Sequence, residues 1–279
     1  MMRITRTSTL AAALSLCLLA VWPAWGSDIL KERRWAEQLT DSLLVGEALY
    51  LQAEGGDFLA VYTPAAGAKQ LGGVILLHGL GAHPDWPDII SPLRQTLPES
   101  GWATLSLQLP ILPNDARFEE YLPLFPAANE RISAGIEHLR ERGILNVALV
   151  GHSLGAAMGA NFLAADSPGI DRVRAFAGIG MGQRPGTVAH TPDTLAKIRL
   201  PVLDMYGSQD LKGVLTSAKE RAKAGKRAGN TAYRQTQIMG ADHFFRGLDD
   251  LLLKQVSSWL TRYAPSTEVS SDQMKSEKP

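Results

Sequence analysis

The chain has almost no cysteine. Its single residue of this type is Cys17, which lies close to the start of the sequence. If the chain is processed before Ser27, as argued below, the remaining protein has no thiol. This excludes disulfide bonds, a cysteine nucleophile and a cysteine metal site from the mature chain.

An excess of charge of one sign is also missing. Twenty-eight Lys and Arg residues balance 28 Asp and Glu residues, which gives a formal net charge of +0. No basic stripe is visible along the sequence, so we expect no nucleic-acid partner. The sequence has no cluster of carboxylates and histidines at metal-ligand spacing, and no phosphate-binding loop after its first buried strand. We therefore expect neither a metal nor another cofactor.

Long apolar runs are missing after the first two dozen residues. The one such run, Leu10 to Val21, follows Arg3 and Arg6 and precedes Pro23-Ala24-Trp25-Gly26. This order is typical of a secretory signal peptide, and the run is short for a membrane span. We expect residues 1–26 to be a signal peptide, with the mature protein periplasmic or secreted and without stable membrane insertion. The alternative is that the segment is retained as an anchor.

The rest of the chain alternates between apolar runs and amphipathic segments. After a partly helical lead-in at 27–42, one domain is predicted over 43–263, followed by a disordered tail at 264–279. Such alternation predicts parallel strands joined by right-handed helical crossovers. Strands are predicted at 43–51, 58–62, 73–77, 102–107, 145–150, 173–177, 202–206 and 232–238. Helices are predicted at 88–97, 127–142, 154–165, 217–228 and 248–263.

The most informative motif follows the predicted strand at 145–150. It reads Gly151-His152-Ser153-Leu154-Gly155 and runs directly into a predicted helix. A G-x-S-x-G turn between a strand and a helix lifts the serine hydroxyl above the edge of a sheet. Gly151 and Gly155 suit this turn because the backbone is crowded on either side of the serine. Ser153 is therefore the candidate nucleophile.

A second loop supplies candidate donors for an oxyanion. His78-Gly79-Leu80-Gly81 follows the apolar run at 73–77. Gly79 and Gly81 allow the main chain to approach a ligand closely, and His78 is expected to brace the loop by hydrogen bonds. We expect the backbone N–H groups of Leu80 and Leu154 to form the oxyanion hole.

The remaining candidate residues follow the last two predicted strands. Asp210 comes after a glycine turn beyond 202–206, and His243 comes after 232–238. Functional groups of open α/β sheets collect beyond the carboxyl ends of strands, so both could reach Ser153. Asp204 lies within its strand, where a structural role is favoured. Asp242 is a secondary candidate, because neighbouring side chains usually point apart.

The order Ser153, Asp210, His243 is typical of α/β-hydrolases, and the chain resembles that superfamily from about Val45 to Tyr263. Within it, the chain is similar to a group of exported, uncharacterised α/β-hydrolase-like proteins. The residues that carry this closer likeness are 73–79, 101–106 and 240–243. The resemblance implies an α/β fold with a mostly parallel sheet of about eight strands and helices on both faces. It also implies that Ser153 is the nucleophile, His243 the base and Asp210 its orienting carboxylate.

The loops give the remaining information on substrate. Residues 178–201 are too few to form a large lid. The proline-rich stretch at 108–126 carries Phe118, Tyr121 and Phe125, which could form one wall of an acyl pocket. A cleft with little lid favours soluble or surface-accessible esters. We expect a secreted serine hydrolase of small carboxylic esters, with thioesters or amides as other substrates. The alternatives are an acyltransferase with the same three residues and a catalytically silent binding protein.

Overall fold

The computed structural model describes residues 26–67, 69–165 and 167–264. The predicted signal peptide lies outside the described residues except for Gly26, and so does Cys17. The predicted disordered tail also lies outside them except for Ala264. Within the described residues, no helix combines the length and the apolar character needed to cross a membrane.

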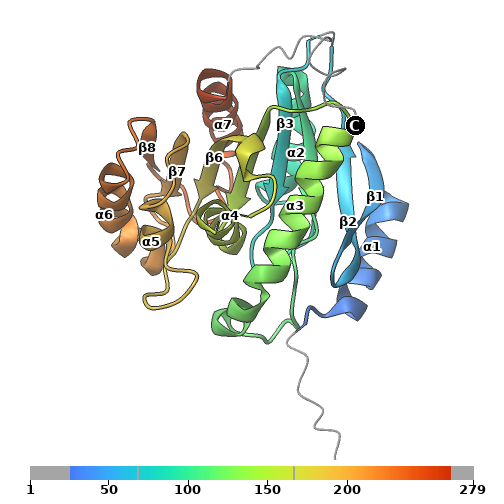
Figure 1. Cartoon of the computed structure of the whole chain (residues 1–279), viewed down its shortest axis with the longest axis horizontal. Helices are drawn as coiled ribbons and strands as arrows, with labels where there is room; N and C mark the ends of the chain where they lie inside the picture. Colours follow the sequence, from blue (N-terminus) through green and yellow to red (C-terminus); the bar gives the residue numbers. More distant parts are fainter. Residues whose placement is uncertain (1–25, 68, 166, 265–279) are drawn as a thin grey trace, which may run out of the picture.

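One eight-stranded sheet forms the centre of the molecule, with the strand order β1-β2-β4-β3-β5-β6-β7-β8. It extends from β1 on the right of Figure 1 to β8 on the left. β1 pairs antiparallel with β2 and β2 pairs antiparallel with β4, whereas all other pairs are parallel. This confirms the predicted mostly parallel sheet. The strands are Glu47–Ala53 (β1), Gly56–Thr63 (β2), Gly72–Leu77 (β3), Trp102–Leu107 (β4), Val147–His152 (β5), Val173–Ile179 (β6), Val202–Gly207 (β7) and Tyr233–Ile238 (β8).

The central strands are apolar along their whole length because helices cover both faces of the sheet. Every residue of β3, β4, β5 and β7 is buried. β8 lies at the edge of the sheet and keeps polar residues, with only Ile238 buried. The continuous apolar runs in the sequence therefore mark the strands that lie inside the sheet.

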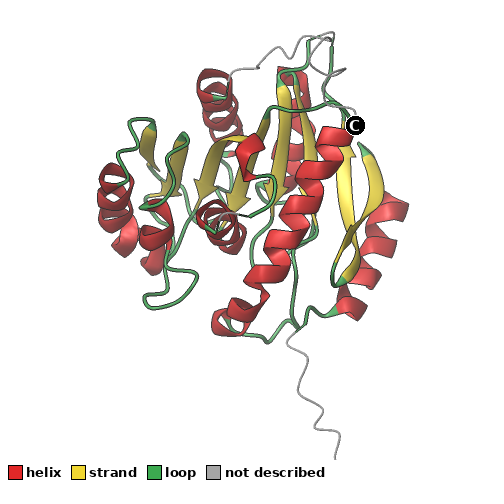
Figure 2. Cartoon of the chain, viewed as in Figure 1, coloured by secondary structure: helices red, strands yellow, loops and turns green. Residues whose placement is uncertain are grey.

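Helices flank the sheet on both sides (Figure 2). Apolar residues of α3, α4 and α5 join one core, and those of α2 and α7 join a second core on the opposite face. The α-helices are Ile29–Ser42 (α1), Ile90–Thr96 (α2), Phe125–Glu141 (α3), Leu154–Ala164 (α4), Thr191–Leu195 (α5), Lys212–Arg227 (α6) and Asp249–Tyr263 (α7). Short 3-10 helices are Leu97–Ser100 (η1), Phe118–Leu124 (η2) and Ile170–Arg172 (η3).

Asp204 has the structural role that its position within a strand favoured. Its Oδ2 atom accepts hydrogen bonds from Arg221 Nε at 2.8 Å, from Tyr233 Oη at 2.7 Å and from Gln235 Nε2 at 2.8 Å. These donors come from α6 and β8, so the carboxylate of β7 joins both elements. Burial, followed by the nearby Asp204 carboxylate, raises the pKa of the Tyr233 phenol, which keeps it a hydrogen-bond donor.

Candidate active site

The turn between β5 and α4 holds Ser153 in an unusual backbone conformation. Its φ is 53° and its ψ is −116°, a combination that is strained for a residue with a side chain. A Cβ atom on Gly151 would lie 2.7 Å from the backbone of Ala156, and one on Gly155 would lie 2.3 Å from the carbonyl oxygens of Leu77 and His78. The turn therefore forms only because both flanking positions are glycine.

Three predicted site residues from distant parts of the chain meet at this turn. Ser153 Oγ lies 2.9 Å from His243 Nε2, and His243 Nδ1 lies 2.6 Å from Asp210 Oδ1. The Asp210 side chain is 0% exposed. Its carboxylate also accepts hydrogen bonds from the N–H of Leu211 at 2.7 Å and of Gly207 at 3.3 Å. These backbone bonds fix the carboxylate toward the imidazole.

The hydrogen bonds define how the His243 imidazole is oriented. Because Asp210 accepts, His243 Nδ1 carries a hydrogen and Nε2 is left to accept the hydroxyl proton of Ser153. Asp242 is directed elsewhere: its Oδ1 atom accepts from the N–H of Phe244 at 2.9 Å and of Arg246 at 3.2 Å. Asp242 thus shapes the loop, and Asp210 is the carboxylate that bonds to the imidazole.

The loop after β3 lies directly against the serine. A Cβ atom on Gly79 would be 3.4 Å from Ser153 Cβ and 3.1 Å from His152 Nδ1. Leu80 follows Gly79, and Leu154 is the first residue of α4, whose N–H has no partner inside the helix. Gly81 adopts a φ of 66°, which is accessible to glycine at little cost. The two expected oxyanion donors therefore belong to segments that flank Ser153.

Two buried histidines support these segments. His78 Nδ1 donates to Gly79 O at 2.8 Å, while its Nε2 atom accepts from Leu109 N at 3.0 Å. His152 Nε2 donates to His243 O at 3.0 Å. Burial lowers the pKa of His78 to about 3. Burial, followed by the nearby His243 imidazole, lowers the pKa of His152 to about 4. Both rings are therefore neutral near pH 7, and a neutral ring is what the acceptor role of His78 Nε2 requires.

The sequence was compared with models of protein families. A model for a protein family of unknown function, DUF3530, matches residues 29–122 and 126–262. The chain belongs to the DUF3530 family. A search of the curated proteins finds no match for this DUF3530 chain.

Solved structures resemble the DUF3530 chain over most of its length. Est1E from Butyrivibrio proteoclasticus is 19% identical with a TM-score of 0.61, and the match covers 78% of this chain and 98% of Est1E. A dienelactone hydrolase from Anabaena variabilis is 22% identical with a TM-score of 0.61, and the match covers 78% of this chain and 98% of the hydrolase. XC6422 from Xanthomonas campestris is described as an α/β serine hydrolase without lid. It is 15% identical with a TM-score of 0.61, and the match covers 80% of this chain and 97% of XC6422. This DUF3530 member has the α/β-hydrolase fold.

Gly180 is a site residue of the DUF3530 chain that sequence reasoning missed. It follows β6, and a Cβ atom there would lie 2.9 Å from His243 Cε1 and 3.5 Å from Asp210 Oδ2. Its φ of 61° is also one that favours glycine. The signal is the glycine-rich stretch Gly178-Ile179-Gly180-Met181-Gly182 at the carboxyl end of a predicted strand, which the sequence pattern alone placed only within a segment too short for a large lid.

A cavity of about 210 Å³ opens beside Ser153 and His243 in this DUF3530 protein. One of the three aromatic residues expected in its wall, Phe118, does line it. Tyr121 and Phe125 are each 1% exposed and belong to the core, so the expectation was wrong for both. Tyr121 Oη accepts the N–H of Leu112 at 3.1 Å, which holds it beneath the loop. The remaining lining residues are Leu154, Ala157, Gly180, Gly182, Gln183, Arg184, Leu211, Gly213 and Val214.

The cavity of the DUF3530 chain is bordered by an ion pair between a loop and the 3-10 helix η2. Arg184 Nε, from the loop after β6, donates to Glu119 Oε1 in η2 at 2.9 Å. The Arg184 guanidinium also lies 4.8 Å from the centre of the Phe118 ring.

Within the described residues, no group of three His, Cys, Asp or Glu side chains is arranged to hold a metal ion.

Proposed function

We propose that this protein is a serine hydrolase that cleaves carboxylic esters through an acyl-enzyme on Ser153. The observation that carries the proposal is the chain of hydrogen bonds from Ser153 to His243 to Asp210, built on a strained turn beside an open cavity. A buried carboxylate that orients an imidazole toward a hydroxyl is the arrangement that makes serine nucleophilic. Two structures that share the fold are named as an esterase or an esterase domain, which supports the same class of reaction.

In the acylation step, Ser153 Oγ attacks the ester carbonyl carbon while its proton passes to His243 Nε2. The carbonyl oxygen becomes negatively charged and accepts hydrogen bonds from the N–H groups of Leu80 and Leu154. Asp210 stabilises the imidazolium that forms. His243 then gives the proton to the departing alkoxide, which leaves as an alcohol, and the acyl group stays on Ser153.

In the deacylation step, water takes the place of the alcohol. His243 Nε2 removes a proton from the water as its oxygen attacks the acyl carbon. The tetrahedral intermediate collapses, the proton returns to Ser153 Oγ, and the carboxylic acid leaves. Thioesters and amides would follow the same route with a thiol or an amine as the leaving group.

The experiment that tests the proposal is labelling with a fluorophosphonate, a probe that reacts readily with activated serines. We expect the wild type to be labelled, with labelling lost in Ser153→Ala and in His243→Ala. A folded wild-type protein that resists the probe would reject the hydrolase and favour the silent binding protein. Hydrolysis of p-nitrophenyl esters of increasing chain length would then define the acyl preference, and an added alcohol would reveal acyl transfer.

We also propose that the protein is exported and that processing leaves Ser27 at its N-terminus. The sequence order before Ser27 supports this, and Ser27 itself is well suited to begin a folded chain. Its hydroxyl accepts from Ile111 N at 2.7 Å and contacts the carboxylate of Glu32. N-terminal sequencing of the protein recovered from the periplasm or medium should read Ser-Asp-Ile. Recovery of the unprocessed chain in the membrane fraction would instead support the retained anchor.

A further inference from the structure

α6 carries six cationic residues, and only one of them is buried. This residue, Arg221, donates to the carboxylate of Asp204 in β7, so one side of α6 is fixed to the sheet. The opposite side faces solvent at the left end of the molecule in Figure 1. We call the five exposed cations the cationic face of α6. They are Lys212, Lys219, Lys223, Lys226 and Arg227.

The helical repeat brings the lysines of this face together. Lys219 lies two turns after Lys212, and Lys223 and Lys226 follow Lys219 at the i+4 and i+7 spacing of one helix side. No basic stripe was visible along the sequence, because other residues separate these lysines there. They align only when 212–227 forms one helix, and the predicted helix began at Ser217.

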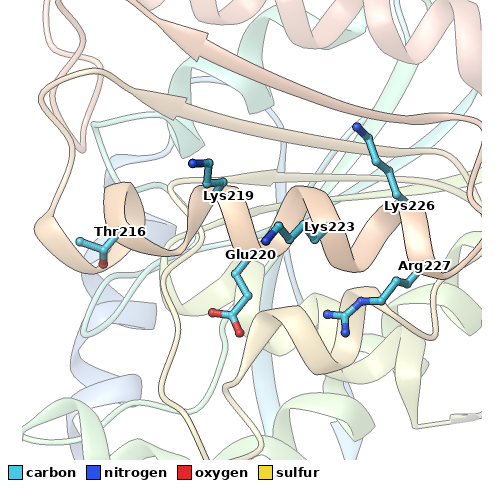
Figure 3. A pocket seen from close by; sticks show the side chains of 6 residues that line it. All are labelled: Thr216, Lys219, Glu220, Lys223, Lys226 and Arg227. Carbon is cyan, nitrogen blue, oxygen red and sulfur yellow. The ribbon is translucent and has the colours of Figure 1, made fainter.

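The cationic face is an open surface and not an enclosed pocket. Figure 3 shows Lys219 and Lys226 directed to one side of α6, Glu220 and Arg227 to the other, and Lys223 between them. These side chains surround a shallow hollow of about 620 Å³, lined by Thr216, Lys219, Glu220, Lys223, Lys226 and Arg227. All of the lining residues belong to α6, so no second element closes over a small ligand.

The positive charge of this face has almost no counter-charge. Glu220 is the one carboxylate on α6, and none of the five cations forms an ion pair within the described part of the chain. On α3, by contrast, Arg140 pairs with Glu137 one turn away. The whole chain has a formal net charge of +0, so α6 does not simply share in a general excess of cations.

This arrangement is unfavourable for the helix itself. Lys219 and Lys223 are four residues apart, as are Lys223 and Arg227, so like charges repel in successive turns. Lys212 lies in the first turn, where the helix macrodipole disfavours a cation, and that turn has no acidic residue. Only Lys226 and Arg227, in the last turn, are stabilised by the macrodipole. Proteins break such local rules chiefly where a surface has a function.

The composition of the face indicates the kind of partner that binds it. Protein interfaces are depleted in lysine and have an apolar centre, but no large apolar side chain is exposed between Lys212 and Arg227, a stretch that is described throughout. The exposed residues of this stretch include no Asn or Gln to read bases and no aromatic ring to stack on them. Lysine ammonium groups bind phosphates as point charges, without a fixed geometry. A layer of anionic lipid headgroups fits this chemistry.

We propose that the cationic face of α6 docks on a surface of anionic phospholipid headgroups. Its lysines extend over about 21 Å of helix, so they contact several headgroups at once. The face begins at the candidate site, because Lys212 stands between Leu211 and Gly213, which both line the cavity. Docking therefore favours esters held in the same surface, a consequence that rests on the proposed hydrolase function.

The test is cosedimentation of the purified protein with vesicles of phosphatidylglycerol or of phosphatidylcholine. The wild type should bind phosphatidylglycerol only, and salt should release it because exposed charges are screened. A glutamine variant, with Lys219→Gln, Lys223→Gln and Lys226→Gln, should bind about 10²-fold more weakly, since each lysine near an anionic surface contributes roughly fivefold.

Two further variants show whether position and charge are responsible. The control combines Arg33→Gln, Lys69→Gln and Lys254→Gln, which removes the same charge from exposed sites outside α6. It should bind nearly as tightly as the wild type. Replacing the three α6 lysines with arginine should preserve binding. Urea unfolding should find the glutamine variant at least as stable as the wild type, because repulsion between neighbouring lysines is removed.

Three results would overturn the docking surface. The first is equal binding of phosphatidylglycerol by the glutamine variant and the wild type. The second is equal binding of phosphatidylcholine and phosphatidylglycerol by the wild type. The third is tighter binding to a short DNA duplex than to phosphatidylglycerol, lost in the glutamine variant, which would assign the face to nucleic acid instead.

Docking and hydrolysis are measured separately. Ser153→Ala should bind vesicles as the wild type does, and the glutamine variant should keep the wild-type kcat/KM for soluble p-nitrophenyl acetate. Hydrolysis of a long-chain p-nitrophenyl ester carried in phosphatidylglycerol vesicles should fall in the glutamine variant. Absence of turnover and of fluorophosphonate labelling would reject the hydrolase, whereas normal turnover with vesicle binding that ignores α6 would reject only the docking surface.

Discussion

Gly180 has no side chain, yet its position affects both His243 and Asp210. The His243 imidazole lies between the backbone of Gly180 and the ring of His152. The centres of the two histidine rings are 4.8 Å apart. Orientation of the imidazole therefore depends on a position that carries no chemistry.

Replacing Gly180 with alanine should lower kcat by about 10²-fold, because a displacement of the imidazole by a fraction of an ångström disturbs its bonds to Ser153 and Asp210. KM for a short p-nitrophenyl ester should change much less. Gly186→Ala is the control: Gly186 lies in the same loop with a φ of 74°, and a Cβ atom there would meet nothing within 4 Å. Similar losses in both variants would mean that backbone strain, and not the contact with His243, sets the effect.

His152 makes the stability of the protein depend on pH. Its pKa falls from an ordinary value of 6.5 to about 4 in the folded protein, chiefly because of burial. The unfolded chain therefore takes up this proton first as the pH falls. The stabilisation is fully present above pH 6.5 and is lost progressively between pH 6.5 and 4, amounting to about 3 kcal/mol.

Urea unfolding at pH 7.5 and pH 4.5 can isolate this contribution in a His152→Gln variant. The wild type should lose more free energy of unfolding than the variant over this interval, since glutamine has no proton to take up. The difference in free energy of unfolding between the wild type and the variant should therefore become smaller as the pH falls. Parallel losses in both proteins would contradict a buried neutral His152.

At the scale of elements, the contact of α4 with β3 depends on the small residues at the start of the helix. Gly155 lies so close to the end of β3 that a Cβ atom would overlap two carbonyl oxygens, which cannot rotate away. Gly159, one turn later, lies against the side chains of Leu77 and Phe176. A Cβ atom at Gly155 should therefore displace the whole helix from β3.

Gly155→Ala should therefore lower the free energy of unfolding by about 3 kcal/mol and reduce labelling of Ser153. Gly213→Ala provides the comparison, because Gly213 is also helical but a Cβ atom there meets nothing within 4 Å. That variant should be as stable as the wild type or slightly more stable. Thermal unfolding followed by circular dichroism would measure the stability of both variants. A Gly155→Ala protein as stable as the wild type would show that the turn is less crowded than described.

Apolar runs bounded by glycine predicted the strands well, because buried parallel strands have one composition along their length. The ends of helices were harder to predict. α6 begins at Lys212, whereas the sequence predicted a start at Ser217. The first turn was missed because Gly213 interrupts the amphipathic pattern there. Phe118 was predicted in the cavity wall and lies there, but the pattern could not separate it from Tyr121 and Phe125. Which aromatic side chain faces a cavity is decided by packing, and no local pattern carries that information.

At the scale of the whole molecule, α1 is joined to the body by a buried ion pair. Arg131 of α3 contacts both carboxylate oxygens of Glu32, each at 3.1 Å, and the two side chains are 5% and 6% exposed. Arg131 also donates to Gln108 O at 2.9 Å, next to the strand that leads toward the site. The predicted lead-in is therefore an integral part of the fold.

Glu32→Gln should lower the free energy of unfolding by about 3–5 kcal/mol, because it leaves the Arg131 guanidinium buried without its counterion. Glu37→Gln changes an exposed carboxylate on the same helix and should cost less than about 0.5 kcal/mol. Chemical denaturation of the two variants distinguishes them. Equal stability would mean that the Glu32–Arg131 pair does not stabilise the docking of α1.

The two ends of the described chain leave the molecule at opposite sides of the sheet. Ser27 bonds to Ile111, beyond the carboxyl end of β4, whereas Ala264 O accepts from Asn146 Nδ2, just before β5 begins, at 3.1 Å. An affinity tag or biosensor linker fused after Ala264 would therefore hold the protein with its opening facing the solution. The same linker fused before Ser27 would crowd the face through which substrate arrives.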